Sequence, residues 1–354
     1  MPQNRIAKKG YKNHVNLLLT GEELTSFFQR TMPKEKVVYQ HSHQWLRSSW
    51  HKILYLVILA GFFLWYPGQN RLTMLSTPPS PRAFTLPFPI PTPAPYPTNA
   101  TGVYPGAEVT AAGVVIEDVD SGVILYQRNS YEPFAPASTT KILTSLVALD
   151  AYGLDDVLTV KTLMNNGASM KLVAGERMTV ENLLYGTLIQ SGNDAAYALS
   201  ENYPGGVSAF VAAMNQKAKS LNLAQSHFTN PVGFDDPTHQ MTPMDLARLA
   251  NVALSNKTIA KMVAIPQITI SDVTHTYFHS LTNVNQLLGK IPGVGGIKTG
   301  WTEEAGENLV TLVDRGGHRV IVVALKSKDR FGDTTKLIDW VFVNTQWEQI
   351  EKGN

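Results

Sequence analysis

Ser138 and Lys141 lie three residues apart at the beginning of an apolar run, and this spacing could support nucleophilic catalysis. Residues at positions i and i+3 of a helix share one face. A serine hydroxyl is a poor nucleophile until a base takes its proton. A lysine can be that base when burial and nearby positive charge lower its pKa. The pattern alone is weak, because a second copy, Ser49 to Lys52, precedes another apolar run.

Two further short motifs strengthen the hypothesis of a catalytic serine. "SGN", Ser191–Asn193, follows the helical pattern "VENLLYGTLIQ", although Ser220–Asn222 matches the same S-x-N pattern. "KTG", Lys298–Gly300, occurs once, in the glycine-flanked strand pattern "GVGGIKTGWTEEAG". Glycines in a strand would let a substrate backbone lie close to it. Each motif is weak alone, but the three in this order form a specific constellation.

The elements that must position these motifs predict an α+β fold. "GVVIEDVDSGVILYQ" predicts a β-hairpin that turns at Asp120–Gly122. Ser138–Asp150 predicts a helix with one apolar side, and a largely helical stretch follows to about Asn256. "GVGGIKTGW", "ENLVTLVDR" and "HRVIVVALK" then predict strands, and "TTKLIDWVFVNTQW" predicts a closing helix. We therefore expect one antiparallel sheet flanked by helices, with a largely helical insertion.

The N-terminal part predicts a membrane anchor. Residues 1–52 are basic, with 9 Lys/Arg against 3 Asp/Glu, and Ile53–Tyr66 is uncharged. A helix of those 14 residues would span roughly 21 Å, less than the bilayer core of about 30 Å. A buried core helix and a cleaved signal peptide are alternatives, but the interfacial aromatic flanks favour a single-pass transmembrane helix over 53–68. The positive-inside rule then places 1–52 in the cytoplasm.

A proline-rich segment separates this predicted anchor from the globular part. Thr77–Pro97 contains 9 prolines in 21 residues. Proline lacks the N–H donor that helices and strand ladders need, so an extended spacer without ladder pairing is expected. The predicted organisation is thus a linker over 69–106 and a catalytic domain over 107–354.

Charge and composition exclude several functions. Residues 1–106 carry 11 Lys/Arg and 3 Asp/Glu, whereas 107–354 carry 19 Lys/Arg and 25 Asp/Glu. A net acidic globular part argues against nucleic acid as a partner. The absence of cysteine excludes disulfides, thiolate metal sites and a cysteine nucleophile. His275 and His279 lie four residues apart without an evident third ligand, so no metal or other cofactor is expected.

Four segments resemble the D-alanyl-D-alanine carboxypeptidase family, the low-molecular-mass penicillin-binding proteins. They are "PASTTKILT", "LIQSGNDAA", "NPVGFDDPTHQMTPMDLA" and "GGIKTGWTEEAGENLV". The resemblance runs from about Val109 to about Val343. It implies a β-lactamase/D,D-peptidase-like fold. It also implies a serine carboxypeptidase that removes the terminal D-alanine of peptidoglycan stem pentapeptides and is inhibited by β-lactam antibiotics.

The resemblance implies catalytic roles for three side chains. Ser138 would attack the carbonyl of the D-Ala–D-Ala bond, and Lys141 would be its general base. Ser191 would relay the proton to the leaving D-alanine, with Lys298 tuning that relay electrostatically.

The resemblance also implies a set of substrate contacts. Asn193 would bind a substrate amide and orient Lys141. On the KTG strand, which continues through Gly300, Lys298 and Thr299 would face the terminal carboxylate. The backbone N–H groups of Ser138 and Trp301 would form the oxyanion hole.

The chain departs from the family pattern at three places. Asn308 stands where many members have a cysteine, so sensitivity to thiol reagents is not expected. Pro243 replaces an alanine in "HQMTPMD", which suggests an altered start of the following helix. The chain ends about 50 residues after KTG, so the N-terminal anchor is expected to replace the C-terminal β domain and amphipathic anchor of many members.

Other functions remain open beside the carboxypeptidase. A peptidoglycan D,D-endopeptidase of the same family would use the same residues, and a non-catalytic β-lactam sensor or scaffold would keep the pocket alone. A class A β-lactamase is disfavoured, because no E-x-x-L-N segment lies between Asn193 and Lys298. The expected location is the bacterial cell membrane, with the catalytic domain outside the cytoplasm.

Overall fold

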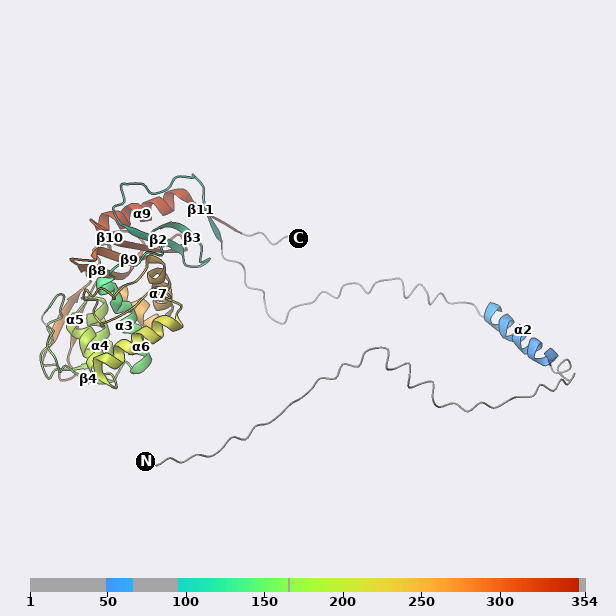
Figure 1. Cartoon of the computed structure of the whole chain (residues 1–354), viewed down its shortest axis with the longest axis horizontal. Helices are drawn as coiled ribbons and strands as arrows, with labels where there is room; N and C mark the ends of the chain where they lie inside the picture. Colours follow the sequence, from blue (N-terminus) through green and yellow to red (C-terminus); the bar gives the residue numbers. More distant parts are fainter. Residues whose placement is uncertain (1–48, 66–94, 165, 350–354) are drawn as a thin grey trace, which may run out of the picture. The chain divides into compact units, whose positions relative to one another are not determined.

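The computed structural model describes residues 49–65, 95–164 and 166–349 of the chain (Figure 1). The chain divides into two compact units, Met1–Phe88 and Pro89–Asn354.

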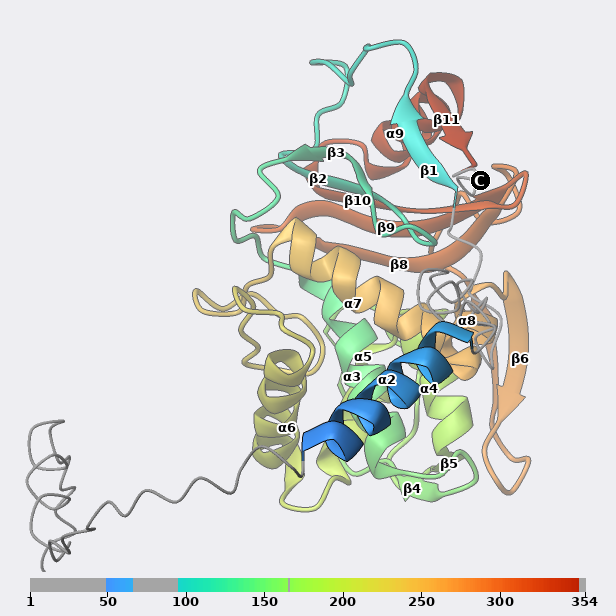
Figure 2. The same cartoon turned by 90° about the vertical axis from the view of Figure 1, so that its right-hand side faces the viewer.

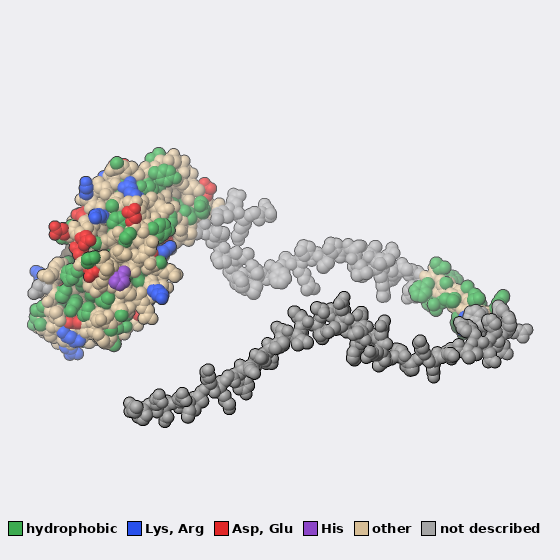
Figure 3. Space-filling model, viewed as in Figure 1, with side chains coloured by type: hydrophobic (Ala, Val, Ile, Leu, Met, Phe, Trp, Pro, Cys, Tyr) green, Lys and Arg blue, Asp and Glu red, His purple; other side chains and the backbone are tan. Residues whose placement is uncertain are grey.

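The first unit contains the helix α2, Ser49–Trp65. Hydrophobic side chains cover this helix, whereas the second unit shows charges of both signs on the face drawn in Figure 3. Within the described parts of the chain, no helix has both the length and the apolar character that crossing a bilayer requires. The predicted transmembrane segment 53–68 overlaps α2 over residues 53–65, and residues 66–68 lie outside the described residues, as do 1–48 and 69–94.

The second unit is built on a five-stranded antiparallel sheet with the strand order β3-β2-β10-β9-β8. Its strands are β2 (Gly113–Asp118), β3 (Ile124–Arg128), β8 (Val294–Thr302), β9 (Gly306–Arg315) and β10 (His318–Ser327). The predicted hairpin is β2 and β3, and the three predicted C-terminal strands are β8, β9 and β10. The KTG motif lies on β8, at one edge of this sheet.

Both faces of the sheet are buried, because its strands carry apolar side chains on alternate sides. Along β10, Ile321 and Val323 join the apolar core that contains the helical region, whereas Val320 and Val322 join a second core formed with α9, Arg330–Asn344. In Figures 1 and 2, α9 covers one face of the sheet, and the helices between β3 and β8 in the sequence lie against the opposite face.

The helical region lies between β3 and β8 in the sequence. Its helices are η1 (Ala137–Thr140), α3 (Lys141–Ala151), α4 (Val180–Leu188), α5 (Asn193–Glu201), α6 (Gly206–Ser220), α7 (Pro243–Ser255) and α8 (Lys257–Val263). Two small hairpins complete it, β4 (Val157–Thr159) with β5 (Arg177–Thr179), and β6 (Gln267–Ser271) with β7 (Phe278–Thr282). The prediction of a sheet flanked by helices, with a largely helical insertion, is confirmed.

Two local predictions were wrong. Pro243 does not disturb its helix: it occupies the first turn of α7, where the missing N–H costs nothing, and the Thr242 side chain caps the helix by accepting from the Asp245 N–H. The proline-rich segment was expected to make no ladder, yet β1 (Tyr96–Asn99) pairs with β11 (Thr345–Glu348). Pro97 is tolerated because this ribbon has two strands only, so each has an unpaired edge.

Candidate active site

Ser138 and Lys141 meet where the 3₁₀ turn η1 continues into α3. The preceding residue, Ala137, has φ +48°, a strained conformation that turns the chain sharply before Ser138. Lys141 is completely buried, and its Nζ lies 2.8 Å from the Ser138 Oγ. The same Nζ donates to the Val232 carbonyl at 2.8 Å. A neutral amine that donates to Val232 keeps its lone pair for the Ser138 proton.

Electrostatics favour this neutral amine. Burial lowers the pKa of Lys141 well below its usual value, the positive charge of Lys298 lowers it further, and Asp194 opposes the shift. Lys298 is also buried, and burial together with the nearby Arg330 guanidinium lowers the pKa of Lys298 to about 7. Both effects on Lys141 favour the neutral amine that a general base requires.

Ser191 forms a second serine–lysine pair. It lies between α4 and α5 with φ +61°, and the Lys298 Nζ donates to its Oγ at 2.8 Å. The next residue, Gly192, donates its N–H to the Gly186 carbonyl of α4. The strained backbone is thus held by the helices on both sides, and the hydroxyl is presented to the lysine of β8.

Asn193 holds the segment that contains Asn166 and Ala168, which is one wall of the site. Its side-chain Nδ2 donates to the Asn166 carbonyl at 2.7 Å, and its N–H donates to the Ala168 carbonyl. The resemblance implied that Asn193 orients Lys141, but the group that bonds to the Lys141 amine besides Ser138 is the Val232 carbonyl.

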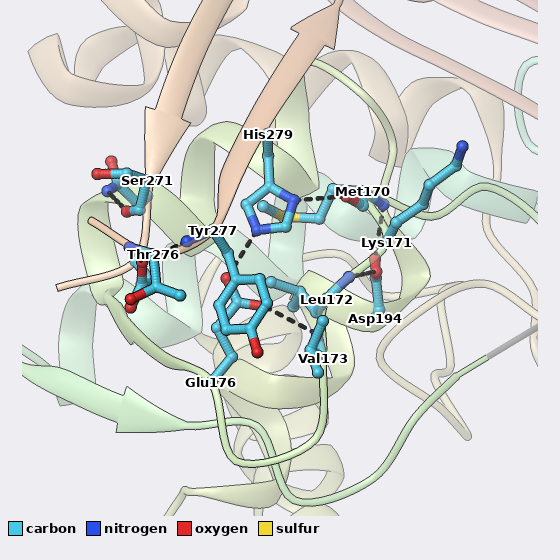
Figure 4. A network of polar contacts seen from close by, with 12 residues as sticks. Met170, Lys171, Leu172, Val173, Glu176, Asp194, Ser271, Thr276, Tyr277 and His279 are labelled. Atoms are coloured by element: carbon cyan, nitrogen blue, oxygen red, sulfur yellow. Dashed lines mark hydrogen bonds and ion pairs between the residues drawn. The ribbon is translucent and has the colours of Figure 1, made fainter. Parts of the chain in front are cut away.

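A buried polar network supports this wall from behind (Figure 4). The Asp194 carboxylate accepts hydrogen bonds from the N–H groups of Met170 and Leu172. The Met170 carbonyl in turn accepts from the Nδ1 of His279, whose Nε2 lies 2.6 Å from a Glu176 carboxylate oxygen. His279 thus ties strand β7 to the wall.

His275 and His279 do not converge. His275 is exposed and contacts the Ser271 hydroxyl, whereas the His279 ring is buried against Met170 and Glu176.

Strand β8 runs directly beside the turn that carries Ser138. A Cβ on Gly300 would lie 2.9 Å from the Pro136 carbonyl oxygen and 3.2 Å from the Ser138 nitrogen, so only glycine permits this approach. Asn308 holds the chain before the turn, because its Nδ2 donates to the Ala135 carbonyl. The residue that departs from the family pattern therefore has a structural role here.

The three motifs meet at an open pocket of about 450 Å³. The residues predicted from sequence that line it are Ser138, Ser191, Asn193, Thr299, Gly300 and Trp301. Lys141 and Lys298 lie beneath this surface and reach it through the two serines. The Trp301 side chain is 62% exposed at the pocket.

Sequence reasoning missed two groups at this pocket. The Val232 carbonyl is a backbone group, so no side-chain motif predicts it. Arg330, at the start of α9, lines the pocket and donates to the Gly300 carbonyl at 2.8 Å. Its buried Nε has no hydrogen-bond partner, which leaves a donor of this cation unused beside the KTG strand. A lone arginine about 30 residues after KTG carries no recognisable spacing signal.

Replacing Gly233 by alanine should damage both stability and acylation. Gly233 has φ +89°, and its Cβ would lie 1.8 Å from the Ala137 carbonyl oxygen, next to the nucleophile. We expect a loss of more than ~3 kcal/mol in the free energy of unfolding. The matched control is Gly122→Ala, with φ +71° but open space around its Cβ, which should cost only about 1 kcal/mol. Equal losses in chemical denaturation would contradict the close approach.

This arrangement defines a serine acyl-transfer enzyme: a serine hydroxyl against a buried amine base, a second serine–lysine pair, and an open pocket with buried cations. The profile of peptidase family S11, D-alanyl-D-alanine carboxypeptidase, matches residues 99–329. The chain belongs to this family of serine peptidases.

Relatives agree with this assignment. The chain is 36% identical over 254 residues to the D-alanyl-D-alanine carboxypeptidase DacF of Bacillus subtilis, covering 69% of this chain and 65% of DacF. It is 31% identical to a D-alanyl-D-alanine endopeptidase of Pseudomonas aeruginosa, covering 66% of this chain and 78% of that protein. The crystal structure of the Streptomyces K15 DD-transpeptidase superposes with a TM-score of 0.64 and 32% identity, over 68% of this chain and 99% of that one. The fold is thus that of the D,D-peptidases.

Proposed function

We propose that the protein is a serine-type D-Ala–D-Ala carboxypeptidase. It removes the terminal D-alanine of peptidoglycan stem pentapeptides through an acyl-enzyme on Ser138, and β-lactams inhibit it by acylating the same serine. The observation that carries this proposal is the 2.8 Å approach of the buried Lys141 amine to the Ser138 hydroxyl at the floor of the pocket.

Acylation begins when Lys141 takes the Ser138 proton and the oxygen attacks the carbonyl of the D-Ala–D-Ala bond. Negative charge then develops on the carbonyl oxygen. The backbone N–H groups of Ser138 and Trp301 are the proposed donors to it, since β8 lies against the Ser138 nitrogen at Gly300.

Collapse of this intermediate releases D-alanine. The leaving nitrogen needs a proton, and the one that Lys141 took from Ser138 passes to it by way of the Ser191 hydroxyl, which accepts from Lys298; Lys141 is then neutral again. Asn193 binds the amide of the stem peptide from the opposite wall. Water then attacks the acyl-enzyme, and Lys141 again serves as the base.

The C-terminal carboxylate binds at the end of the pocket where Thr299, Lys298 and Arg330 lie. Thr299 lines the pocket, and Lys298 lies directly beneath it. Arg330 adds a guanidinium whose Nε has no partner, and guanidinium groups bind carboxylates strongly. This concentration of positive charge favours an enzyme that cuts next to a free carboxylate.

The Michaelis constant should depend on pH through Lys298. Its pKa is lowered to about 7, so the amine carries its positive charge below that pH and loses it above. We expect the Michaelis constant for a pentapeptide to rise as pH increases through about 7, and the dependence to disappear in Lys298→Met. Initial rates of D-alanine release between pH 5.5 and pH 9 test this. A Michaelis constant that falls across this range would contradict the carboxylate role.

A D,D-endopeptidase that splits cross-links is the second candidate, and the endopeptidase from Pseudomonas aeruginosa favours it. Purified muropeptides separate the two activities. Release of free D-alanine from pentapeptide monomers, without splitting of cross-linked dimers, supports the carboxypeptidase. Dimer splitting supports the endopeptidase, and the absence of both activities in a protein that binds penicillin supports a sensor or scaffold.

We further propose that the catalytic unit acts outside the cytoplasmic membrane, because peptidoglycan stem peptides are cross-linked there. Protease treatment of intact cells tests this: the catalytic unit should be digested while a cytoplasmic control protein survives.

A further inference from the structure

His239 is a buried imidazole that connects two segments of the catalytic centre. It precedes α7 and is 2% exposed. Its Nε2 lies 2.9 Å from the Oγ1 of Thr140, the residue before Lys141. Its Nδ1 accepts from the N–H of Thr229 at 3.1 Å, and lies 3.2 Å from the Thr229 hydroxyl and 3.3 Å from the Asn230 side-chain nitrogen.

These contacts determine the tautomer of the ring. A backbone N–H can only donate, so the Nδ1 that faces Thr229 must be unprotonated. In the neutral ring the proton is then on Nε2, which donates to the Thr140 hydroxyl. A second proton on Nδ1 would face the Thr229 N–H and the Asn230 amide, so the imidazolium does not fit this site.

The charges around the ring agree with a neutral imidazole. Burial lowers the pKa of His239 to about 4; the carboxylates of Asp236 and Asp235 oppose that shift and His227 adds to it. Asp236 lies on the 230–238 loop, whose Thr238 carbonyl bonds to the His227 ring. On the adjoining helix, burial and the charge of Lys298 lower the pKa of Lys141, which also favours an uncharged neighbour.

The contacts continue from His239 to the catalytic amine. The Asn230 side-chain oxygen accepts from the N–H groups of Val232, Gly233 and Phe234 and so folds this segment into a tight turn. The carbonyl of Val232 is the acceptor of the Lys141 Nζ. Thr140, His239, Asn230, Val232 and Lys141 therefore form a closed ring, because Thr140 and Lys141 are adjacent in the chain.

We propose that His239 is a positioning residue for Lys141. It holds the turn at Val232 at a fixed distance from the turn that carries Ser138. The Val232 carbonyl thereby stays directed at the Lys141 amine. This inference rests on the proposed role of Lys141 as the base. Loss of the contact should slow acylation more than it weakens non-covalent binding, because the base is displaced while the carboxylate site on β8 remains.

A pair of Thr140 variants tests the contact with least disturbance. Thr140→Val has nearly the same shape but no hydroxyl, whereas Thr140→Ser keeps the hydroxyl. With the full chain and a fluorescent penicillin, we expect the acylation rate constant to fall by about 10-fold or more in Thr140→Val, since small misplacements of catalytic groups slow reactions by up to ~10²-fold. Thr140→Ser should restore most of the rate, and the dissociation constant before acylation should change less than threefold.

His239→Phe extends the test. Phenylalanine can keep the edge-to-face contact with Phe228, whose ring centre lies 5.5 Å from that of His239, but it makes none of the hydrogen bonds. We expect acylation to slow by about 100-fold, and addition of Thr140→Val to His239→Phe to slow it no further. His275→Gln, an exposed histidine outside the ring of contacts, should acylate at the wild-type rate.

The outcomes separate this inference from the proposed function. Failure of the wild type to take up penicillin would refute the proposed function. If the wild type takes up penicillin and the folded variants Thr140→Val and His239→Phe take it up at the same rate, the positioning role is refuted. Changes in thermal stability without a change in the acylation rate would also refute it. The ¹⁵N chemical shifts of the ring test the contacts without any activity: an unprotonated Nδ1 at pH 7 supports them, and a protonated Nδ1 overturns them.

Discussion

Ser138→Ala is expected to abolish both penicillin labelling and D-alanine release, with a loss of at least ~10⁴-fold in rate. The reason is that the hydroxyl is the only group on the turn that the buried Lys141 amine can activate, at 2.8 Å. The variant should fold as the wild type does, because the Lys141 amine still has the Val232 carbonyl as an acceptor. Rates of labelling by fluorescent penicillin and of D-alanine release from a pentapeptide measure the effect.

The control for this prediction is Ser220→Ala, at the end of α6. Ser220 begins the second S-x-N copy, and its hydroxyl donates to the Lys217 carbonyl on the surface. It should keep full activity. Labelling of Ser138→Ala within tenfold of the wild-type rate would mean that another residue is the nucleophile.

Replacing Lys141 should separate activity from stability. Lys141→Met removes the base, and we expect acylation to fall by about 10³-fold, within the usual range for general-base catalysis. Methionine fills a similar volume without a buried polar amine, so the free energy of unfolding should stay within ~1 kcal/mol or increase. Lys141→Arg should be equally inactive, because a guanidinium stays protonated and cannot accept the serine proton.

The matched control is Lys52→Met in the second S-x-x-K copy. Lys52 is exposed on α2, whereas Lys141 is completely buried. It should acylate normally. An active Lys141→Arg enzyme, measured by stopped-flow acylation at pH 7, would show that Lys141 acts through its charge and not as a base.

The sequence predicted those parts of the site that depend on side-chain identity at short spacing. Ser138 and Lys141 are one helical turn apart, and KTG lies within a single strand. The local secondary structure alone therefore arranges the side chains of each motif. The strands β9 and β10 were also predictable from their apolar runs "LVTLV" and "VIVVAL", and β8 from the glycine-flanked strand pattern around KTG. These features need no knowledge of which distant segments pack together.

Features that depend on long-range packing were not predictable. The Val232 carbonyl accepts from Lys141 although the two residues are 91 positions apart in the chain. Every residue has a backbone carbonyl, so the residue type does not indicate which carbonyl makes this contact. The pairing of β1 with β11 joins segments near opposite ends of the second unit, and prolines in β1 argued against any strand there. The orientation of Lys141 by Asn193 stays a prediction; the contact that the structure shows for the Asn193 side-chain nitrogen is with the Asn166 carbonyl.

The central claim is that an acyl-enzyme forms on Ser138. The most direct test is to quench the full chain after reaction with penicillin, digest it, and locate the adduct by tandem mass spectrometry. The account predicts one penicilloyl group on Ser138, formed in proportion to the loss of D-alanine release. An adduct on Ser191 or another residue, or no adduct in a protein shown to be folded, would contradict it.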